Sequence, residues 1–391
     1  MCIRDRGVAT RGSNLALTQA RLVAALLAEV AEVEVELVVV ETLGDRRTDT
    51  PISALGGQGV FVKEVQAAVL DGRADLAVHS AKDLPSTPTP GLVIAAVPER
   101  ADPRDALVGS TLDGLAPGSL VATGSVRRRA QLAWLRPDLT FTGLRGNIET
   151  RLAKAPAYDA IVVAAAALAR LGRLEDVAEL LAPTVMVPQV GQGALAVECR
   201  EDDDRARAAL AAVDHGPSHR AVDAERAFLA TLGSGCDLPV GAYAVLAAGP
   251  AIPTGTTGPA GERAGPAGER AGPAGPGPAV LTADAAGPAA GHAVLTAERA
   301  GPAAGPGPAG PRPAVLTADG AGHAVLTAGG ELSLTGLLAG VDGRLVLRHT
   351  ATGTDGPALG RAVATHLLDK AGGRALIGEG RWSPPGPGLA P

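Results

Sequence analysis

A cysteine on a glycine-rich loop is the residue that could do covalent chemistry. Cys236 lies in the segment GSGCD over residues 233–237, directly after a helix-like stretch over 220–232 that a glycine ends. Such a loop leaves a thiol accessible, and the reactivity of a thiolate requires access. No histidine is spaced to suggest a Cys-His hydrolase, so a tethering role suits Cys236 better than acyl transfer. The alternative is an inert thiol, an interpretation that fits Cys199 in its apolar run.

A charged pair stands where an apolar, strand-like run ends. Residues 76–80 (LAVHS) lead directly into Lys82 and Asp83. A carboxylate at this point could move protons or stabilise a cation that develops on a substrate. A solvated turn is the alternative. His79 lies inside the strand and is better explained as a core residue than as a base.

Arginines recur at three places where a strand-like run gives way to a helix-like stretch. The three turns are 11–13 (RGS), 124–129 (GSVRRR) and 145–147 (RGN), with Arg151 after the last. Helix N-termini favour anions, and the guanidinium fork matches carboxylate or phosphate. Ligands of open α/β sheets bind at the carboxyl ends of strands. We therefore expect a long polyanionic ligand, unless the serines and asparagine are ordinary helix caps beside solvated arginines.

The segments that must position these residues alternate in type over residues 7–248. The strand-like runs are 33–40, 76–78, 120–122 and 161–163. Amphipathic stretches lie between them, such as 15–29 with Leu15, Leu22 and Leu26 on one face. This alternation predicts an α/β architecture with mostly parallel sheets.

The composition indicates apolar cores and no strongly basic face. At 391 residues the chain should hold two or three domains, and 46% of it is hydrophobic. A formal net charge of -6 argues against nucleic-acid binding, and three cysteines without ligand spacing argue against a disulfide framework or a metal site. Because no signal-peptide-like start and no run of about 18 apolar residues occurs, we expect a cytoplasmic chain without a membrane span.

The composition changes sharply at about residues 249–330. The segment GPAGERA occurs twice over 258–271, and the pentad AVLTA occurs four times between 279 and 328. Spacers rich in Pro and Gly cannot bury enough apolar surface to become ordered. We expect a disordered insertion, with edge strands formed by some pentads as the alternative. Strand-like sequence returns at 331–334 and 344–347, and a helix is expected near 359–370.

Taken together, the motifs resemble the porphobilinogen deaminase family. The matching pieces are 9–13 (ATRGS), 56–64 (GGQGVFVKE), 74–85 (ADLAVHSAKDLP), 100–105 (RADPRD), 124–128 (GSVRR), 144–147 (LRGN), 190–194 (VGQGA) and 235–236 (GC). They run in family order over residues 7–245, which makes the resemblance very specific. The C-terminal portion matches only loosely.

The resemblance implies an α/β fold with two periplasmic-binding-protein-like lobes and a smaller α+β C-terminal domain. It places the first domain at 1–98 and 194–215 and the second at 99–193. The third domain, 216–391, would carry the cofactor cysteine and the insertion at about 249–330. The implied protein is a monomer with no nucleic-acid or membrane partner.

The activity implied by the resemblance is that of a transferase of tetrapyrrole biosynthesis. Family members join four porphobilinogen molecules head to tail, release ammonia each time, and free linear hydroxymethylbilane by hydrolysis. The primer is a dipyrromethane cofactor on the cysteine that matches Cys236, and Asp83 matches the catalytic aspartate. The implied cofactor-binding residues are Lys82, Thr123, Ser125, Arg127, Arg128, Arg145 and Gly146. The implied substrate-binding residues are Arg11, Ser13, Gln19, Arg151 and Gln192.

Several positions depart from the family pattern, and two other functions compete with it. Ala54 and Gln58 stand where many members have lysines, Gly124 stands where serine is common, and residues 1–6 do not look like the family's opening strand. A two-lobed anion-binding protein would predict a signal peptide and no need for Cys236. An interaction protein would use the repeats as its functional part.

Overall fold

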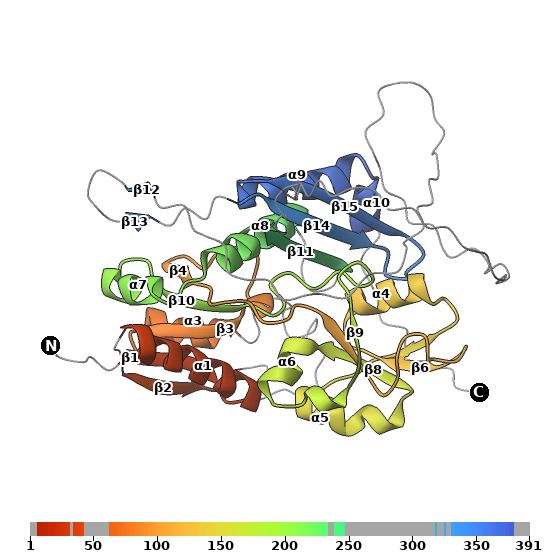
Figure 1. The fold of residues 1–391 in the computed structure, drawn as a ribbon, viewed down its shortest axis with the longest axis horizontal. Coiled ribbons are helices and arrows are strands. Elements are labelled where there is room, and N and C mark those ends of the chain that lie inside the picture. The colour runs from red at the N-terminus through yellow and green to blue at the C-terminus, as the bar shows by residue number, and fades with distance from the viewer. Residues whose placement is uncertain are drawn as a thin grey trace, which may run out of the picture.

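The computed structural model describes residues 6–31, 34–42, 62–233, 238–246, 317–318, 324–325 and 330–378. Cys236, Ala54, Gln58 and most of the repeat segment therefore lie outside the described residues. The described chain forms two five-stranded sheets and one three-stranded sheet, and a separate two-stranded pair. Figure 1 shows the two larger sheets lying below the three-stranded sheet. None of the described helices combines the length and apolar character needed to cross a membrane.

The first sheet has the strand order β2-β1-β3-β10-β4. Its elements are β1 (Arg6–Arg11), α1 (Asn14–Ala31), β2 (Val35–Val40), α3 (Lys63–Leu70), β3 (Leu76–Ser80), the 3-10 helix η2 (Ala81–Asp83), β4 (Leu92–Ala96), β10 (Leu195–Arg200) and α7 (Asp204–Ala211). β1 runs parallel to β2 and β3, whereas β10 runs antiparallel to β3 and β4. The sheet is therefore mixed rather than wholly parallel, because β10 alone runs against the other four strands. The physical reason is that β10 re-enters this sheet from the second one and runs in the opposite direction.

Helix α1 buries a different face from the one that its leucines suggest. Leu22 is 45% exposed and Leu26 is 38% exposed, whereas Ala20, Val23 and Leu27 are fully buried against the sheet. The helix carries apolar residues around most of its circumference, so the leucine spacing alone did not identify the packed face.

The second sheet has the order β7-β6-β8-β5-β9 and is also mixed. Its elements are β5 (Asp105–Val108), β6 (Leu120–Ala122), α4 (Val126–Leu135), β7 (Thr140–Thr142), α5 (Ile148–Lys154), η3 (Ala155–Ala157), β8 (Ala160–Ala164), α6 (Ala165–Arg170), η4 (Leu174–Asp176) and β9 (Val177–Leu181). β6 is parallel to β7 and β8, and β5 is antiparallel to β8 and β9. The runs of apolar residues at β5 and β8 are buried throughout, as both faces of the sheet are covered.

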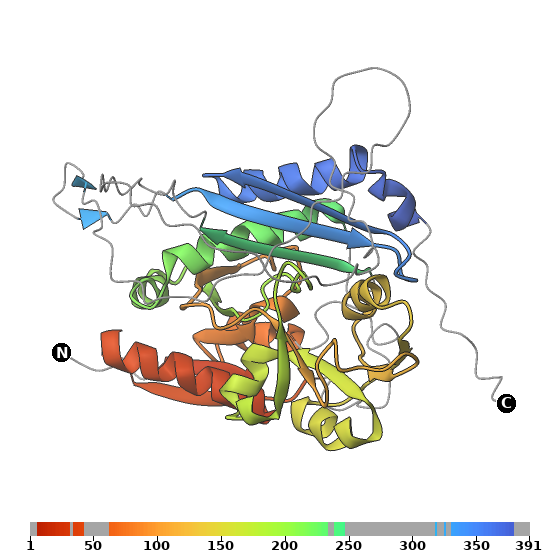
Figure 2. The same ribbon diagram turned by 45° about the vertical axis from the view of Figure 1, so that its right-hand side comes forward.

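The third body is an antiparallel sheet in the order β11-β14-β15. Its elements are α8 (Gly216–Leu232), β11 (Val240–Leu246), β14 (Leu332–Ala339), β15 (Val346–Gly353), α9 (Gly356–Asp369) and α10 (Gly373–Gly378). Figure 2 shows α8 and α9 against one face of this sheet, and Phe228 of α8 lies in the core between them. The other face packs on α4, where Leu337 and Val346 meet Ala130. Within the repeats, β12 (Thr317–Ala318) pairs with β13 (Ala324–Val325).

A buried glutamate on α8 ties this third body to the two segments that cross between the larger sheets. Glu225 accepts hydrogen bonds from Arg100 Nη1 at 2.6 Å and from the Gly191 N–H at 2.7 Å. It also accepts from the Ala244 N–H of β11 at 2.8 Å. Arg100 lies on the outward crossing segment and Gly191 on the return one, so the three bodies meet at one carboxylate.

Candidate active site

The carboxyl end of β3 presents Lys82 and Asp83 on a single anchored turn. Ala81 is buried, and its N–H donates to the Ala194 carbonyl at 3.0 Å. Lys82 is half-buried and Asp83 is exposed. Gly191 lets the return segment pack here, because its φ is +71° and a Cβ would lie 2.9 Å from the Ala81 carbonyl carbon. The turn is therefore held by its backbone, with the side chain of Asp83 exposed and that of Lys82 half-buried.

The turn before α4 is built from hydroxyl side chains. The Ser125 hydroxyl caps the helix by accepting from the Arg128 N–H at 3.4 Å. Thr123 is buried, and its hydroxyl accepts from the Ser125 N–H at 3.2 Å. Ser125 is thus a helix cap, as one of the alternatives expected. Of the three arginines that follow it, Arg127 and Arg128 are not solvated, because they are 3% and 5% exposed, whereas Arg129 is exposed to solvent.

The two arginines of α4 share one buried carboxylate, Asp105 at the start of β5. Arg127 Nη1 lies 2.8 Å from Asp105 Oδ2, and Arg128 Nη2 lies 2.8 Å from Oδ1. Gln192, which is fully buried, donates to Asp105 Oδ1 at 2.9 Å and accepts from Lys82 Nζ at 3.4 Å. The predicted residues Lys82, Arg127, Arg128 and Gln192 therefore form one connected cluster.

The third arginine-bearing turn lies near the same cluster. Asn147 caps α5 by accepting from the Thr150 N–H at 2.8 Å, and Arg151 Nε donates to the Gly146 carbonyl at 2.8 Å. Burial and the positive charges of Arg128 and Arg145 together lower the pKa of Arg151 to about 10, against the opposing effect of Asp83. The turns before α4 and α5 thus bring their arginines close enough for the positive charges to affect one another.

The turn after β1 is built around Gln19 and Ser13. Gln19 is buried on α1 and donates to the Ser80 hydroxyl at 2.9 Å. The Ser13 hydroxyl accepts from the Ala16 N–H at 3.4 Å, as a cap would. Arg11 is half-buried at the end of β1. Through Ser80, this turn borders the strand that carries Lys82 and Asp83.

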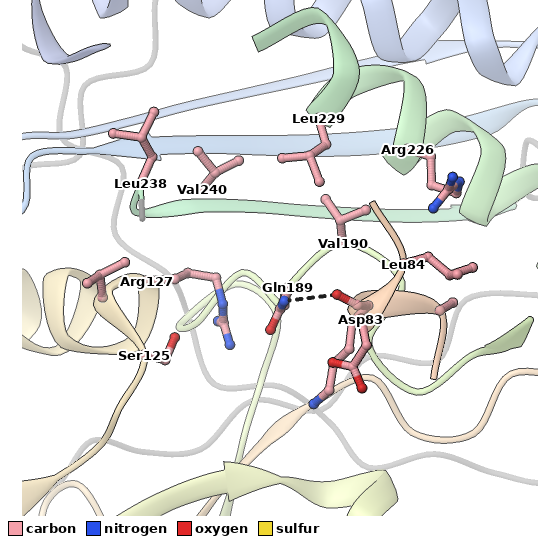
Figure 3. Close-up of a pocket in the computed structure, with 13 residues that line it drawn as sticks. Asp83, Leu84, Ser125, Arg127, Gln189, Val190, Arg226, Leu229, Leu238 and Val240 are labelled. Carbon is pink, nitrogen blue, oxygen red and sulfur yellow. Dashed lines mark hydrogen bonds between the residues drawn. The ribbon is translucent and has the colours of Figure 1, made fainter. Parts of the chain in front are cut away.

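A cavity opens where the three bodies meet, with an empty volume of about 670 Å³ that is partly open to solvent. Four of the predicted residues line it, namely Lys82, Asp83, Ser125 and Arg127. Figure 3 shows Arg127 and Asp83 on opposite sides of Gln189, whose amide donates to the Lys82 carbonyl at 3.3 Å. The remaining predicted residues within the described chain lie outside this lining, and Cys236 lies outside the described residues.

Sequence reasoning missed several residues that line this cavity. They are Ala81, Leu84, Val126, Gln189, Val190, Arg226, Leu229, Leu238 and Val240. Arg226 donates to the Pro85 carbonyl at 2.9 Å, and burial lowers its pKa. Leu238 could have been found from its position, since it stands two residues after Cys236. Gln189 and Arg226 carried no comparable signal.

The electrostatics of the cavity favour a ligand with several negative charges. Burial and the positive charge of Arg128 together lower the pKa of Lys82 to about 8, against the opposing effects of Asp83 and Asp105. Arg127 Nε and Nη2 are buried and have no hydrogen-bond partner among the described residues. Unpaired guanidinium donors in a cavity wall are costly unless an anion meets them. This wall therefore fits a carboxylate-bearing group such as a dipyrromethane.

The sequence matches two protein-family models. Residues 7–208 match the model described as porphobilinogen deaminase, dipyromethane cofactor binding domain, and residues 219–252 match the C-terminal domain of the same enzyme.

Curated relatives show the same similarity, over about 245 to 248 residues. A porphobilinogen deaminase of Acidothermus cellulolyticus is 51% identical over 248 residues, covering 61% of this chain and 75% of the relative. One of Roseiflexus castenholzii is 51% identical over 245 residues, covering 61% and 81%.

Two solved structures are similar at low sequence identity. The methionine binding protein MetQ has a TM-score of 0.35 at 12% identity, covering 56% of this chain and 94% of its own. The GluR0 ligand-binding core from Nostoc punctiforme has a TM-score of 0.30 at 15% identity, covering 53% and 91%. On the family match, the chain belongs to the porphobilinogen deaminase family and is an enzyme of tetrapyrrole biosynthesis that uses a dipyrromethane cofactor.

Proposed function

We propose that the chain holds the dipyrromethane through a thioether to Cys236, extends it with four porphobilinogen units, and releases hydroxymethylbilane by hydrolysis. The observation that carries this assignment is the convergence of Lys82, Asp83, Arg127 and Leu238 at one cavity. Leu238 stands two residues after Cys236, and two peptide units span at most about 7 Å. The proposed anchor is therefore only two residues along the chain from a residue of the cavity wall.

The cofactor supplies the growing end of the pyrrole chain, and the protein supplies binding and orientation. A dipyrromethane carries four carboxylates, because each pyrrole bears an acetate and a propionate. The unpaired donors of Arg127 and the ammonium of Lys82 suit these carboxylates. We assign cofactor binding to Lys82, Thr123, Ser125, Arg127, Arg128, Arg145 and Gly146.

Asp83 is the catalytic residue in this proposal. Its side chain is exposed at the cavity, on the turn that Ala81 anchors. There its carboxylate can move protons for the loss of the substrate's amino group and stabilise the positive charge that develops on the pyrrole. The hydrogen bond from the Gln189 amide to the Lys82 carbonyl helps to hold this turn.

Substrate carboxylates are bound by a second set of residues, Arg11, Ser13, Gln19, Arg151 and Gln192. Arg151 has the strongest support, because burial and neighbouring positive charges lower its pKa and a bound carboxylate would favour its charged form. Gln19 and Gln192 act through the neighbours to which they are hydrogen-bonded, Ser80 and Lys82.

The proposed domain division is 1–98 with 194–215, then 99–193, then 216–391. It is supported by the strand order, since β10 lies in the sheet of β1 to β4 and β5 to β9 form the next sheet. The chain is proposed to be a monomer, which sedimentation would test. It is also proposed to reside in the cytoplasm, which cell fractionation would test.

Intact-mass measurement combined with turnover tests the assignment. The parent chain should exceed its sequence mass by one dipyrromethane, and Cys236→Ala should lose that excess. Asp83→Asn should keep the added mass while hydroxymethylbilane formation falls about 100-fold or more, because proton movement and charge stabilisation are both lost. Asp202→Asn removes a carboxylate that is 87% exposed and serves as the matched control. Near-parental turnover of Asp83→Asn would show that the assignment of Asp83 is wrong.

A further inference from the structure

A buried carboxylate beneath the cavity, Asp105, has no part in the reaction as described so far. Its side chain is fully buried at the first position of β5. Besides the two ion pairs with Arg127 and Arg128, its Oδ1 accepts from Arg128 Nε at 2.9 Å and from Gln192 Nε2 at 2.9 Å. This one carboxylate is therefore paired with both guanidinium groups at once.

The Gln192 amide extends this contact to a third cation. Gln192 Oε1 accepts from Lys82 Nζ at 3.4 Å and lies 3.5 Å from Arg128 Nη2. Its Nε2 donates to the Pro103 carbonyl at 2.7 Å as well as to Asp105. Arg127 and Arg128 therefore pair with Asp105 directly, and Lys82, which also lies beside Asp83, is linked to Asp105 through Gln192.

The ion pairs also determine which donors of Arg127 remain for a ligand. Arg127 Nη1 contacts Asp105 and donates to the Val187 carbonyl at 2.7 Å, which leaves Nε and Nη2 without a partner among the described residues. Arg128 is held differently, since Nη1 donates to the Val162 carbonyl at 2.9 Å while Nε and Nη2 contact Asp105. Arg127, which lines the cavity, thus keeps two donors without a partner among the described residues, whereas the donors of Arg128 are taken up by the protein.

We propose that Asp105 is a positioning residue that serves as the counter-ion of these three cations until the carboxylates of the cofactor arrive, and that it directs the free donors of Arg127 toward them. The proposal rests on the cofactor site described above. A buried cation without a partner is strongly destabilising, so Asp105 matters most when the site holds no other anion. Cofactor carboxylates supply part of the same compensation in the loaded protein.

The state of the carboxyl group supports this role. Burial by itself raises the pKa of Asp105, but the charges of Arg127 and Arg128 and the hydrogen bonds from Arg127 and Gln192 outweigh it. The pKa is held well below its usual range, so the group is negative at neutral pH. Asp105 also raises the pKa of Lys82 and so favours its ammonium form.

A four-way comparison of melting temperatures tests the proposal. Asp105→Asn is introduced into the parent chain and into Cys236→Ala, which cannot hold the cofactor, and intact mass reports loading in each. We expect Asp105→Asn to lower the melting temperature of the Cys236→Ala protein by about 5 °C more than that of the loaded chain. A folded Asp105→Asn chain that carries no cofactor also supports the proposal, because misdirected arginines cannot hold the carboxylates.

Equal losses in the two backgrounds, with normal loading, would overturn the proposal and leave Asp105 a structural residue only. Glu179→Gln is the control, because Glu179 lies in the same sheet and accepts only from the Leu112 N–H among the described contacts, at 2.6 Å. It should lower both melting temperatures equally.

If Asp105→Asn folds in neither background, Asp105→Glu decides the matter, since it keeps the charge. Equal melting losses with normal loading are then expected, and unequal losses overturn the proposal. A parent chain without added mass would instead contradict the cofactor assignment.

Discussion

Lys82 illustrates how the surroundings of one side chain create a demand for anions. Burial and the positive charge of Arg128 lower its pKa to about 8, although Asp83 and Asp105 act in the opposite direction. In the unfolded chain a lysine titrates at about 10.4. The protonated form of Lys82 therefore lowers the free energy of unfolding of the cofactor-free protein. A bound carboxylate would remove this loss of stability.

The stability of the cofactor-free protein should depend on pH through this residue. Between about pH 8 and pH 10.4 the unfolded chain binds more protons at Lys82 than the folded one, so stability rises with pH. Below pH 8 both forms are protonated and the full cost is present. Lys82→Met removes the cost, so in the Cys236→Ala background its stability advantage should shrink as pH increases across this window. Urea unfolding at pH 7.5, 8.5 and 9.5 measures the difference, and a pH-independent difference would contradict the prediction.

Strands β11 and β14 form a hairpin although 85 positions, 247–331, separate them in the sequence. Leu246 pairs with Leu332, so the two ends of the long connection lie directly opposite each other. Hairpin connections of two to five residues are common, and loop-closure entropy grows only slowly with length. The pairing of β11 with β14 therefore does not require the repeats.

Replacing residues 248–329 with Asn-Gly should leave folding and activity intact. The new loop would contain Ala247, Asn, Gly, Gly330 and Glu331, and it retains the Gly330 carbonyl that accepts from Arg220 Nη2 at 2.8 Å. We expect turnover within about twofold of the parent and a melting temperature within about 2 °C. Further deletion of Leu332 is the matched control, because a shift of one residue turns the apolar face of β14 away from the core. Loss of turnover with an unchanged melting temperature would assign the repeats a role in the reaction.

The three bodies are joined by contacts of very different burial. Glu225 is fully buried and contacts both crossing segments as well as β11. At the surface, Asn14 of α1 donates to Glu149 of α5 at 2.5 Å across the two larger sheets. If a buried carboxylate with three partners is removed, water cannot reach those partners to take its place. At an exposed hydrogen bond, water can replace the lost partner.

Glu225→Ala should therefore destabilise the whole molecule. The substitution removes the carboxylate that pairs with Arg100, whose side chain is almost buried, and leaves the Gly191 and Ala244 N–H groups unpaired. We expect a loss of about 3–5 kcal/mol in the free energy of unfolding. Glu149→Ala should cost less than about 1 kcal/mol. Urea unfolding of the two variants makes the comparison, and similar losses would show that Glu225 does not hold the bodies together.

The features that the sequence predicted correctly depend on neighbouring residues. Ser125 and Asn147 cap helices because a cap needs only a side chain and the N–H groups two or three residues later. The strand-like runs at 76–78, 120–122 and 161–163 became β3, β6 and β8 for the same local reason. The order of the motifs was sufficient to recognise the family, which the matches to residues 7–208 and 219–252 confirm.

Only the tertiary structure decided which of these elements meet, and in which direction. The packed face of α1 depended on the sheet beneath it, because apolar residues occur on several sides of the helix. The direction of β10 depended on where the chain returns to the first sheet. Asp105 looked like one acidic residue in a motif, yet its partners Arg128 and Gln192 lie 23 and 87 positions away. Sequence spacing carries local geometry, whereas burial and charge pairing arise only when distant segments pack together.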